Sequence, residues 1–261
     1  MILHSQCSGQ GPDLVLIHGL FGSYENLGVI ARALSDAFRI INIDVRNHGR
    51  SDHSEHMNYA LMATDVADTL DALGVSQCAM LGHSMGGKLA MAFALRYPER
   101  VTKLILADIA PVAYPPRHNA VFAGLQQVQL ASITSRSDAD KQLAAHINEP
   151  GVRQFLLKSL DKTEQGFAWR FNLAALKANY PALIGDELSN SVEHSNTPAQ
   201  FNGPTLFIKG GDSDYILTEH RPAIMARFPN AQAKIIQGTG HWLHAEKPAA
   251  FSKLVRDFLL S

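Results

Sequence analysis

Cysteine is scarce in this sequence. Only Cys7 and Cys78 occur among 261 residues, too few for the disulfide framework that staples small secreted domains. A chain of this length can bury a substantial apolar core without such staples. The low count is compatible with a reducing compartment, and we expect one core carrying an insertion.

Strong charge of either sign and long apolar runs are also missing. The formal net charge is -1, and no basic stripe alternates with aromatic residues, so we expect no nucleic-acid partner. No apolar run approaches the ~20 residues needed to span a bilayer. Residues 1–7 lack the basic and apolar pattern of an export signal. We therefore expect no membrane association and a cytoplasmic location.

The chain does contain strands that alternate with helices. Six short apolar runs have the length of strands that are covered on both faces: Leu14–Ile17, Arg39–Asp44, Cys78–Leu81, Lys103–Ala107, Thr205–Lys209 and Ala233–Ile236. Helical periodicity lies between the runs and closes the chain over Pro248–Leu260. Strand, helix and strand in this order form right-handed crossovers. The pattern predicts an α/β fold with a mostly parallel central sheet and helices on both faces.

The strand signal disappears between Pro111 and about Phe201, where apolar residues recur at helical spacing. We interpret residues 112–201 as a helical cap inserted into a core made of residues 1–111 and 202–261. The cap is expected over the carboxyl edge of the sheet. Four cap aromatics either line an acyl pocket there or, as is commoner for aromatics at helical spacing, belong to the core: Phe122, Phe155, Trp169 and Phe171.

A G-x-S-x-G pentapeptide, Gly82–Gly86, places Ser84 between a predicted strand and a predicted helix. A nucleophilic serine occupies a sharp, strained turn in this setting, where bulk at the glycine positions would strike the neighbouring strand and helix. The N–H of Met85, at the start of the helix, would point to where an oxyanion forms. The motif predicts that Ser84 is a nucleophile.

A serine hydroxyl needs a base to take its proton, and the base needs a partner that holds its tautomer. His241 lies in a glycine-punctuated loop, Gly238–Trp242, directly after the last predicted strand. The chain order of serine, acid and histidine matches that of serine hydrolases. His244 is expected at the start of the closing helix, and its spacing from His241 is not that of a helical zinc motif.

Three carboxylates compete for the position behind the histidine. Asp108 closes the strand that follows the serine's helix, whereas Asp212 and Asp214 follow the next strand. Asp214 fits the commoner placement in serine hydrolases, whereas Asp108 ends an apolar strand beside the strand of the nucleophile, where the alternative role is a helix or turn cap. Spacing alone leaves the choice open.

Two further loops follow predicted strands. The glycines of His18–Gly22 allow a close approach to the serine, so the Leu20 N–H is the expected second oxyanion donor. The loop Asp44–Ser51 is expected to be a structural turn whose Arg and Asp residues hold neighbouring loops, and we assign it no catalytic step.

Six segments carry a resemblance to a known family: HGLFGS, IDVRNHGRSD, GHSMGG, LADIAP, GGDSDY and GHWLHAEKP. Together they resemble the α/β-hydrolase superfamily and, more narrowly, the bacterial YbfF-type esterases and related eukaryotic abhydrolase proteins. The resemblance covers nearly the whole chain. It implies that Asp108 is the acid and that Ser213 supports it. Asp212 and Asp214 flank that serine, which leaves the usual superfamily position as the alternative.

The resemblance implies a serine carboxylesterase that prefers short acyl chains, with a range that extends to acyl-CoA thioesters, and no separate cofactor. The expected partner is a small acyl ester or thioester. A C–C bond hydrolase or lyase with the same triad is the alternative reading. A decayed, ligand-binding homologue is less favoured, because Ser84, His241 and candidate acids are all present. The oligomeric state cannot be read from the sequence.

Overall fold

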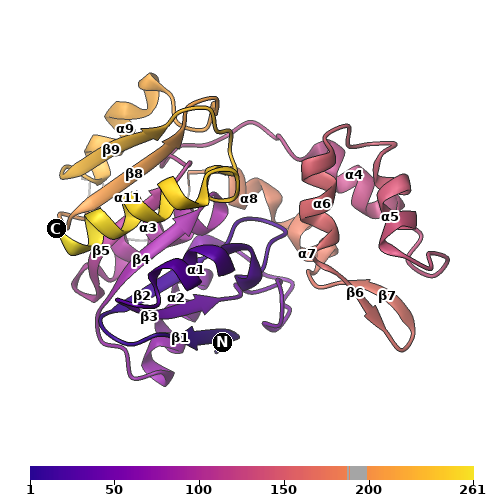
Figure 1. Ribbon diagram of the computed structural model, residues 1–261, viewed down its shortest axis with the longest axis horizontal. Coiled ribbons are helices and arrows are strands. Elements are labelled where there is room, and N and C mark those ends of the chain that lie inside the picture. The colour runs from indigo at the N-terminus through magenta and orange to yellow at the C-terminus, as the bar shows by residue number, and fades with distance from the viewer. Residues whose placement is uncertain (187, 189–198) are drawn as a thin grey trace.

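A central sheet organises the protein (Figure 1), whose computed structural model describes residues 1–186, 188 and 199–261. Within that part of the chain the sheet has seven strands in the order β1-β3-β2-β4-β5-β8-β9. Their bounds are Ser5–Ser8 (β1), Asp13–Ile17 (β2), Arg39–Ile43 (β3), Cys78–His83 (β4), Val101–Ala107 (β5), Thr205–Gly210 (β8) and Ala231–Ile236 (β9). All neighbours pair in parallel except β1, which is antiparallel to β3. The predicted α/β fold is confirmed.

Helices cover both faces of the sheet. The core helices are Gly28–Leu34 (α1), Tyr59–Ala72 (α2), Met85–Arg96 (α3), Arg221–Arg227 (α9), Leu243–Glu246 (α10) and Pro248–Leu260 (α11). Strand β2 shows why both faces need cover, because Leu14 and Leu16 pack with α1 and α11 while Val15 and Ile17 pack with α2 and α3. All four side chains are fully buried. Parallel strands buried in this way read as continuous apolar runs.

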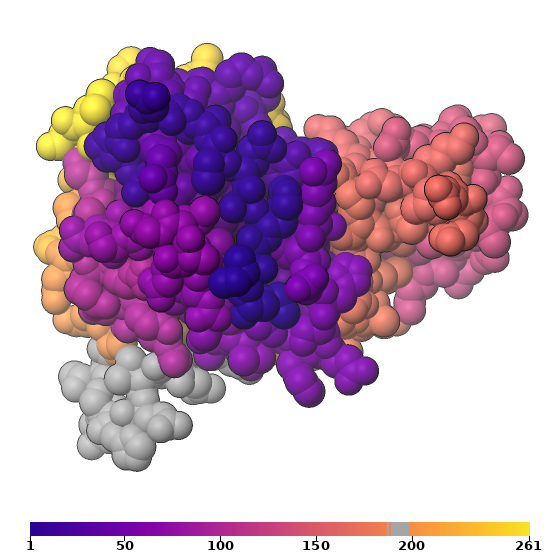
Figure 2. Space-filling model, turned by 90° about the horizontal axis from the view of Figure 1, so that it is seen from below, coloured from indigo at the N-terminus to yellow at the C-terminus, as the bar shows by residue number. Residues whose placement is uncertain are grey.

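Most of the insertion between β5 and β8 forms a separate lobe at one end of the molecule, while its helix α8 (Tyr180–Ile184) lies beside the core (Figures 1 and 2). Its elements are Asn119–Gln127 (α4), Arg136–Leu143 (α5), Pro150–Leu157 (α6), Leu160–Thr163 (β6), Gly166–Trp169 (β7), Leu173–Ala178 (α7) and Tyr180–Ile184 (α8). We refer to this lobe as the cap. Residues 187 and 189–198 of the predicted insertion lie outside the described residues.

Three strands were not predicted. Strand β1 is short and polar, and β6 and β7 form a small antiparallel hairpin inside the otherwise helical cap. Strands β1 and β6 are mostly polar, and the apolar residues of β7, Phe167, Ala168 and Trp169, form a run shorter than those by which the other strands were recognised.

Lys88 connects the cap to the core. It lies on α3, is almost fully buried, and donates hydrogen bonds to three backbone carbonyls, those of Val112 (2.8 Å), Ile184 (3.1 Å) and Gly185 (2.6 Å). Val112 lies where the insertion begins, whereas Ile184 and Gly185 lie at the end of α8. The Lys88 side chain, one helical turn after Ser84, therefore holds the start of the insertion and the end of α8 against α3 by hydrogen bonds.

Cys7 is exposed and Cys78 is buried, and both are free thiols. None of the helices in the described part of the chain combines the length and the apolar character needed to cross a bilayer.

Candidate active site

Ser84 lies in the tight turn between β4 and α3. Its backbone angles are φ 56° and ψ -120°, a conformation that costs a non-glycine residue free energy and is typical of functional sites. A Cβ added to Gly82 would lie 2.2 Å from the carbonyl oxygen of Gly86, and one added to Gly86 would lie 2.4 Å from the carbonyl oxygens of Ile17 and His18. The glycines of the motif are therefore required by the close approach of backbones.

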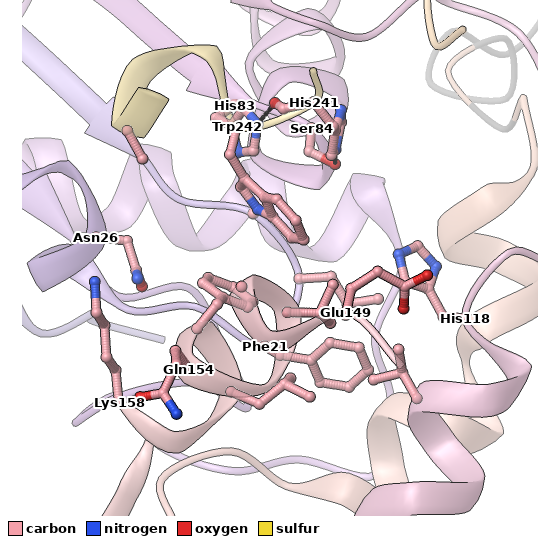
Figure 3. Close-up of a pocket in the computed structure, with 18 of the residues that line it drawn as sticks. Phe21, Asn26, His83, Ser84, His118, Glu149, Gln154, Lys158, His241 and Trp242 are labelled. Carbon is pink, nitrogen blue, oxygen red and sulfur yellow. Dashed lines mark hydrogen bonds between the residues drawn. The ribbon is translucent and has the colours of Figure 1, made fainter. Parts of the chain in front are cut away.

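The structure brings Ser84, His241 and Asp108 together in one chain of hydrogen bonds. His241 Nε2 lies 2.9 Å from Ser84 Oγ, and His241 Nδ1 lies 2.8 Å from Asp108 Oδ2. Figure 3 shows the Ser84 and His241 side chains meeting at one wall of a cavity. The three residues follow β4, β5 and β9, whose carboxyl ends lie at the same edge of the sheet.

Asp108 is fully buried, and its carboxylate accepts hydrogen bonds from three groups. Besides the imidazole, the backbone N–H of Gly210 donates to Oδ1 at 3.0 Å, and the Ser213 hydroxyl donates to Oδ2. Burying a carboxylate is costly unless its oxygens are hydrogen-bonded, and these donors satisfy both oxygens. Its φ of 50° lies in the left-handed region, which is uncommon for a residue other than glycine.

The structure does not bring the other two candidate acids to the imidazole. Asp214 accepts a hydrogen bond from Arg117, and its side chain is 67% exposed. That bond to the guanidinium lowers the pKa of Asp214. Asp212 is exposed, and its backbone N–H donates to the carbonyl of Thr239. Ser213, between them, is the residue of this loop that contacts Asp108.

Tyr215 is a site residue that sequence reasoning missed. Its ring stacks on the His241 imidazole with centroids 3.7 Å apart and planes 15° apart. The Tyr114 hydroxyl donates to the Tyr215 carbonyl at 2.6 Å, and the Arg117 guanidinium lies over the Tyr215 ring. Burial raises the pKa of Tyr215 to about 12, so the phenol stays neutral. The only sequence signal was an aromatic residue directly after the GGDSD segment.

Two further imidazoles pack behind His241. His83 Nε2 donates to the backbone carbonyl of His241 at 2.8 Å, which fixes its tautomer, and the His83 ring lies 4.3 Å from that of His244. Burial lowers the pKa of His244 to about 3 and that of His83 well below its usual value, so both remain neutral. His244 lies in α10, a short helix that precedes the closing helix. Across the described residues, no group of three or more His, Cys, Asp or Glu side chains is arranged to hold a metal ion.

The two backbone groups expected to bind an oxyanion lie beside Ser84. Leu20, Met85 and Ser84 line the same small cavity, and a Cβ added to Gly19 would lie 3.4 Å from Ser84 Cβ. The N–H groups of Leu20 and Met85 have no hydrogen-bond partner among the described residues. Unpaired donors at a helix N-terminus and in an adjacent loop are suited to bind a developing negative charge.

A larger cavity of about 680 Å³ opens between the cap and the core next to Ser84 and His241. Figure 3 shows Trp242 and Phe21 within it and Lys158 and Gln154 at the end away from Ser84. Of the four cap aromatics, Phe155 lines this cavity and pairs with Trp242 at 5.8 Å. Phe122 and Phe171 are instead buried against Phe21, and Trp169 stacks on Phe171.

The Asp44–Ser51 loop forms the structural contacts that were expected of its Asp and Arg residues. Asp44 accepts hydrogen bonds from the backbone N–H groups of Tyr24 (2.7 Å) and Arg50 (2.9 Å). Arg46 forms a buried two-point ion pair with Asp65.

Comparisons with known proteins agree with this architecture. The profile of the alpha/beta hydrolase fold family matches residues 12–248. The chain is 44% identical to Esterase YbfF of Escherichia coli over 98% of this chain and 96% of the relative. It is 37% identical to the sn-1-specific diacylglycerol lipase of Mus musculus over 95% of this chain and 81% of the relative. A solved marine microorganism esterase superposes with a TM-score of 0.93 at 34% identity and covers 99% of both chains.

Proposed function

The chain belongs to the α/β-hydrolase fold family and hydrolyses esters, and we propose that it does so through an acyl-enzyme formed on Ser84. The observation that carries the proposal is the hydrogen-bonded chain from Ser84 Oγ to His241 (2.9 Å) and from His241 to Asp108 (2.8 Å). Both distances are within the range in which a proton can pass between the groups.

In the first half-reaction, His241 Nε2 takes the Ser84 proton while Oγ attacks the acyl carbonyl. The resulting oxyanion binds the N–H groups of Leu20 and Met85, each of which contributes ~3 kcal/mol to transition-state stabilisation, as oxyanion-hole donors do elsewhere. The imidazolium then gives its proton to the leaving oxygen. Asp108 keeps the Nδ1–H of His241 in place and stabilises the positive charge.

In the second half-reaction, water replaces the alcohol. His241 takes a proton from the water, hydroxide attacks the acyl carbon, and the Ser84 oxygen leaves with that proton restored. Ser213 supports the reaction indirectly, because its hydroxyl donates to the carboxylate oxygen that also contacts the imidazole.

We propose short-chain acyl esters as substrates, with acyl-CoA thioesters as a further class. The relatives differ in this respect, since one is named an esterase and one a lipase specific for the sn-1 position of diacylglycerol. A series of p-nitrophenyl esters of graded acyl length, run beside acyl-CoA thioesters of the same lengths, distinguishes the classes.

The same series tests the mechanism with a Ser84→Ala variant. Loss of one hydroxyl leaves a small cavity but removes the acyl acceptor, so turnover should fall to background while the circular dichroism spectrum is unchanged. Turnover by the folded variant within a few-fold of the parent would rule out the serine mechanism.

A further inference from the structure

Two cavities of very different size meet at Ser84. The larger, of about 680 Å³, extends under the cap, and the smaller, of about 40 Å³, lies between α3, α8 and the segment after β5. Ser84 and Leu20 line both cavities, so a substrate carbonyl held between Ser84 Oγ and the Leu20 N–H can direct one of its substituents into each.

Two residues distinguish the cavities chemically. Among the described residues, His241 lines the larger cavity and does not line the smaller one, whereas the reverse is true of Met85. His241 Nε2 must deliver its proton to the oxygen of the leaving group. The leaving group must therefore lie on the side of the larger cavity, which leaves the smaller one for the acyl substituent.

We propose that the small cavity is the acyl pocket and that the large cavity under the cap holds the alcohol, so that the substrate is a very short acyl group on a bulky, largely apolar alcohol. This inference rests on the proposed serine esterase function. It assigns the cap residue Phe155, with Trp242, to the recognition of the alcohol. The sequence alone had suggested an acyl pocket under the cap.

The volumes set the size limit. A cavity of about 40 Å³ is a few times the ~10–15 Å³ that a single buried water needs, and far smaller than the ~150 Å³ apolar cavity that binds benzene. It suits an acetyl or propionyl group. The larger cavity, at about 680 Å³, falls within the ~300–1,000 Å³ of sites for drug-sized ligands.

The walls of the small cavity are held in place. Lys88 lines it, and the hydrogen bonds from its ammonium to the carbonyls of Val112, Ile184 and Gly185 join the helix on one side to the chain on the other. Leu183, also in the lining, is buried. A methylene that does not fit a pocket changes kcat/KM by ~10–200-fold, so discrimination against longer acyl chains should be steep.

Two substrate series test the assignment on the whole enzyme. The first varies the acyl group from acetate to octanoate on one phenol, and the second keeps acetate and varies the alcohol from phenol to naphthol to phenylphenol, whose acidities are similar. We expect kcat/KM to fall by about 100-fold or more from propionate to hexanoate. Along the alcohol series it should stay within about 10-fold of the phenyl ester or rise.

A matched pair of variants locates the two substituents. Ile184→Ala enlarges the small cavity, and Val152→Ala enlarges the large one, both side chains being partly buried and outside the proposed catalytic machinery. Ile184→Ala should raise the ratio of hexanoate to acetate activity by about 10-fold or more, and Val152→Ala should leave it unchanged. Thermal unfolding checks that both fold, and Ile184→Val is the milder replacement if the first does not.

Three outcomes are distinguishable. A steep fall with acyl length that only Ile184→Ala relieves supports the assignment. A rise in kcat/KM from acetate to octanoate that Val152→Trp abolishes would overturn it, because the acyl chain would then lie under the cap while Ser84-dependent hydrolysis persisted. If the parent and Ser84→Ala hydrolysed esters at equal rates, Ser84 would not be the nucleophile. Both the proposed function and the pocket assignment that rests on it would then be wrong.

Discussion

Asp108→Asn replaces one carboxylate oxygen with an NH₂ group, and the surrounding hydrogen bonds decide where that group lies. The Gly210 N–H donates to Oδ1 at 3.0 Å, so the amide oxygen must stay on that side. The NH₂ group then occupies the position of Oδ2 and faces His241 Nδ1, which lies 2.8 Å away. A donor there requires Nδ1 to be an acceptor, so the proton moves to Nε2.

An imidazole protonated at Nε2 cannot take the proton of Ser84, 2.9 Å away. The equivalent change in a serine-protease triad lowers kcat by ~10⁴-fold, which corresponds to about 5 kcal/mol in the activation barrier. We expect a loss of that order here. The fold should survive, because asparagine has the same shape as aspartate and keeps the bond from Gly210.

The assay is kcat and KM for p-nitrophenyl acetate, with circular dichroism and thermal unfolding as checks of the fold. Asp214→Asn is the matched control, since it makes the same chemical change on the neighbouring loop. Its side chain is largely exposed and pairs with Arg117 on the surface, so kcat should change by less than about 3-fold. Nearly normal turnover by Asp108→Asn, together with an inactive Asp214→Asn, would show that Asp214, at the usual superfamily position, is the acid instead.

Three further predictions concern other contacts. Ser213→Ala should lower kcat on the same ester by about 10–100-fold, between the two aspartate variants, because it removes one charge-assisted hydrogen bond from Asp108; an unchanged kcat would contradict this. Lys88→Met should lower the free energy of unfolding, measured in urea, by about 3 kcal/mol or more, because buried carbonyls lose their donor; a loss below 1 kcal/mol would contradict the tie between cap and core. Burial holds the pKa of His244 at about 3 in the folded chain, so as the pH drops the unfolded chain takes up this proton first. The free energy of unfolding should therefore fall as the pH drops from ~6.5 to ~3, by up to ~1.4 kcal/mol per pH unit. His244→Phe should flatten that slope by this amount, whereas the exposed His53→Gln should leave it unchanged; equal slopes would contradict the assignment.

The inner parallel strands could be predicted because burial on both faces leaves a continuous apolar run in the sequence, as in β2 and β4. Strand β1 could not, since its residues Ser5–Ser8 are mostly exposed and it is held by backbone pairing with β3. In the hairpin, β6 is mostly polar and β7 offers only three apolar residues. Strand β1 and this hairpin are held by backbone pairing, which leaves no hydrophobic pattern, whereas the other edge strand, β9, is mostly exposed but was predicted from its largely apolar run Ala233–Ile236.

Site residues in a local motif could be predicted from the sequence, whereas those placed by contacts between distant segments could not. Ser84 lies in a local motif whose glycines are required by nearby backbone, so its setting could be inferred from a few residues. The proximity of Asp108 to Ser213 depends on the pairing of β5 with β8, where Ala107 lies opposite Ile208. The spacing of residues along the chain does not indicate which strands pair, so it could not identify Asp108 as the acid. The stacking of Tyr215 on His241 likewise requires two loops to meet in space.

If Ser84 is the nucleophile, a reagent that reacts with activated serines should form a covalent adduct on it. The parent and Ser84→Ala proteins are treated with a fluorophosphonate, and the intact mass and the modified peptide are measured. We expect one adduct per parent chain, located on Ser84, and none on the folded Ser84→Ala protein. An adduct on another residue, or a folded parent that hydrolyses esters and remains unlabelled, would contradict a serine acyl-enzyme at this site.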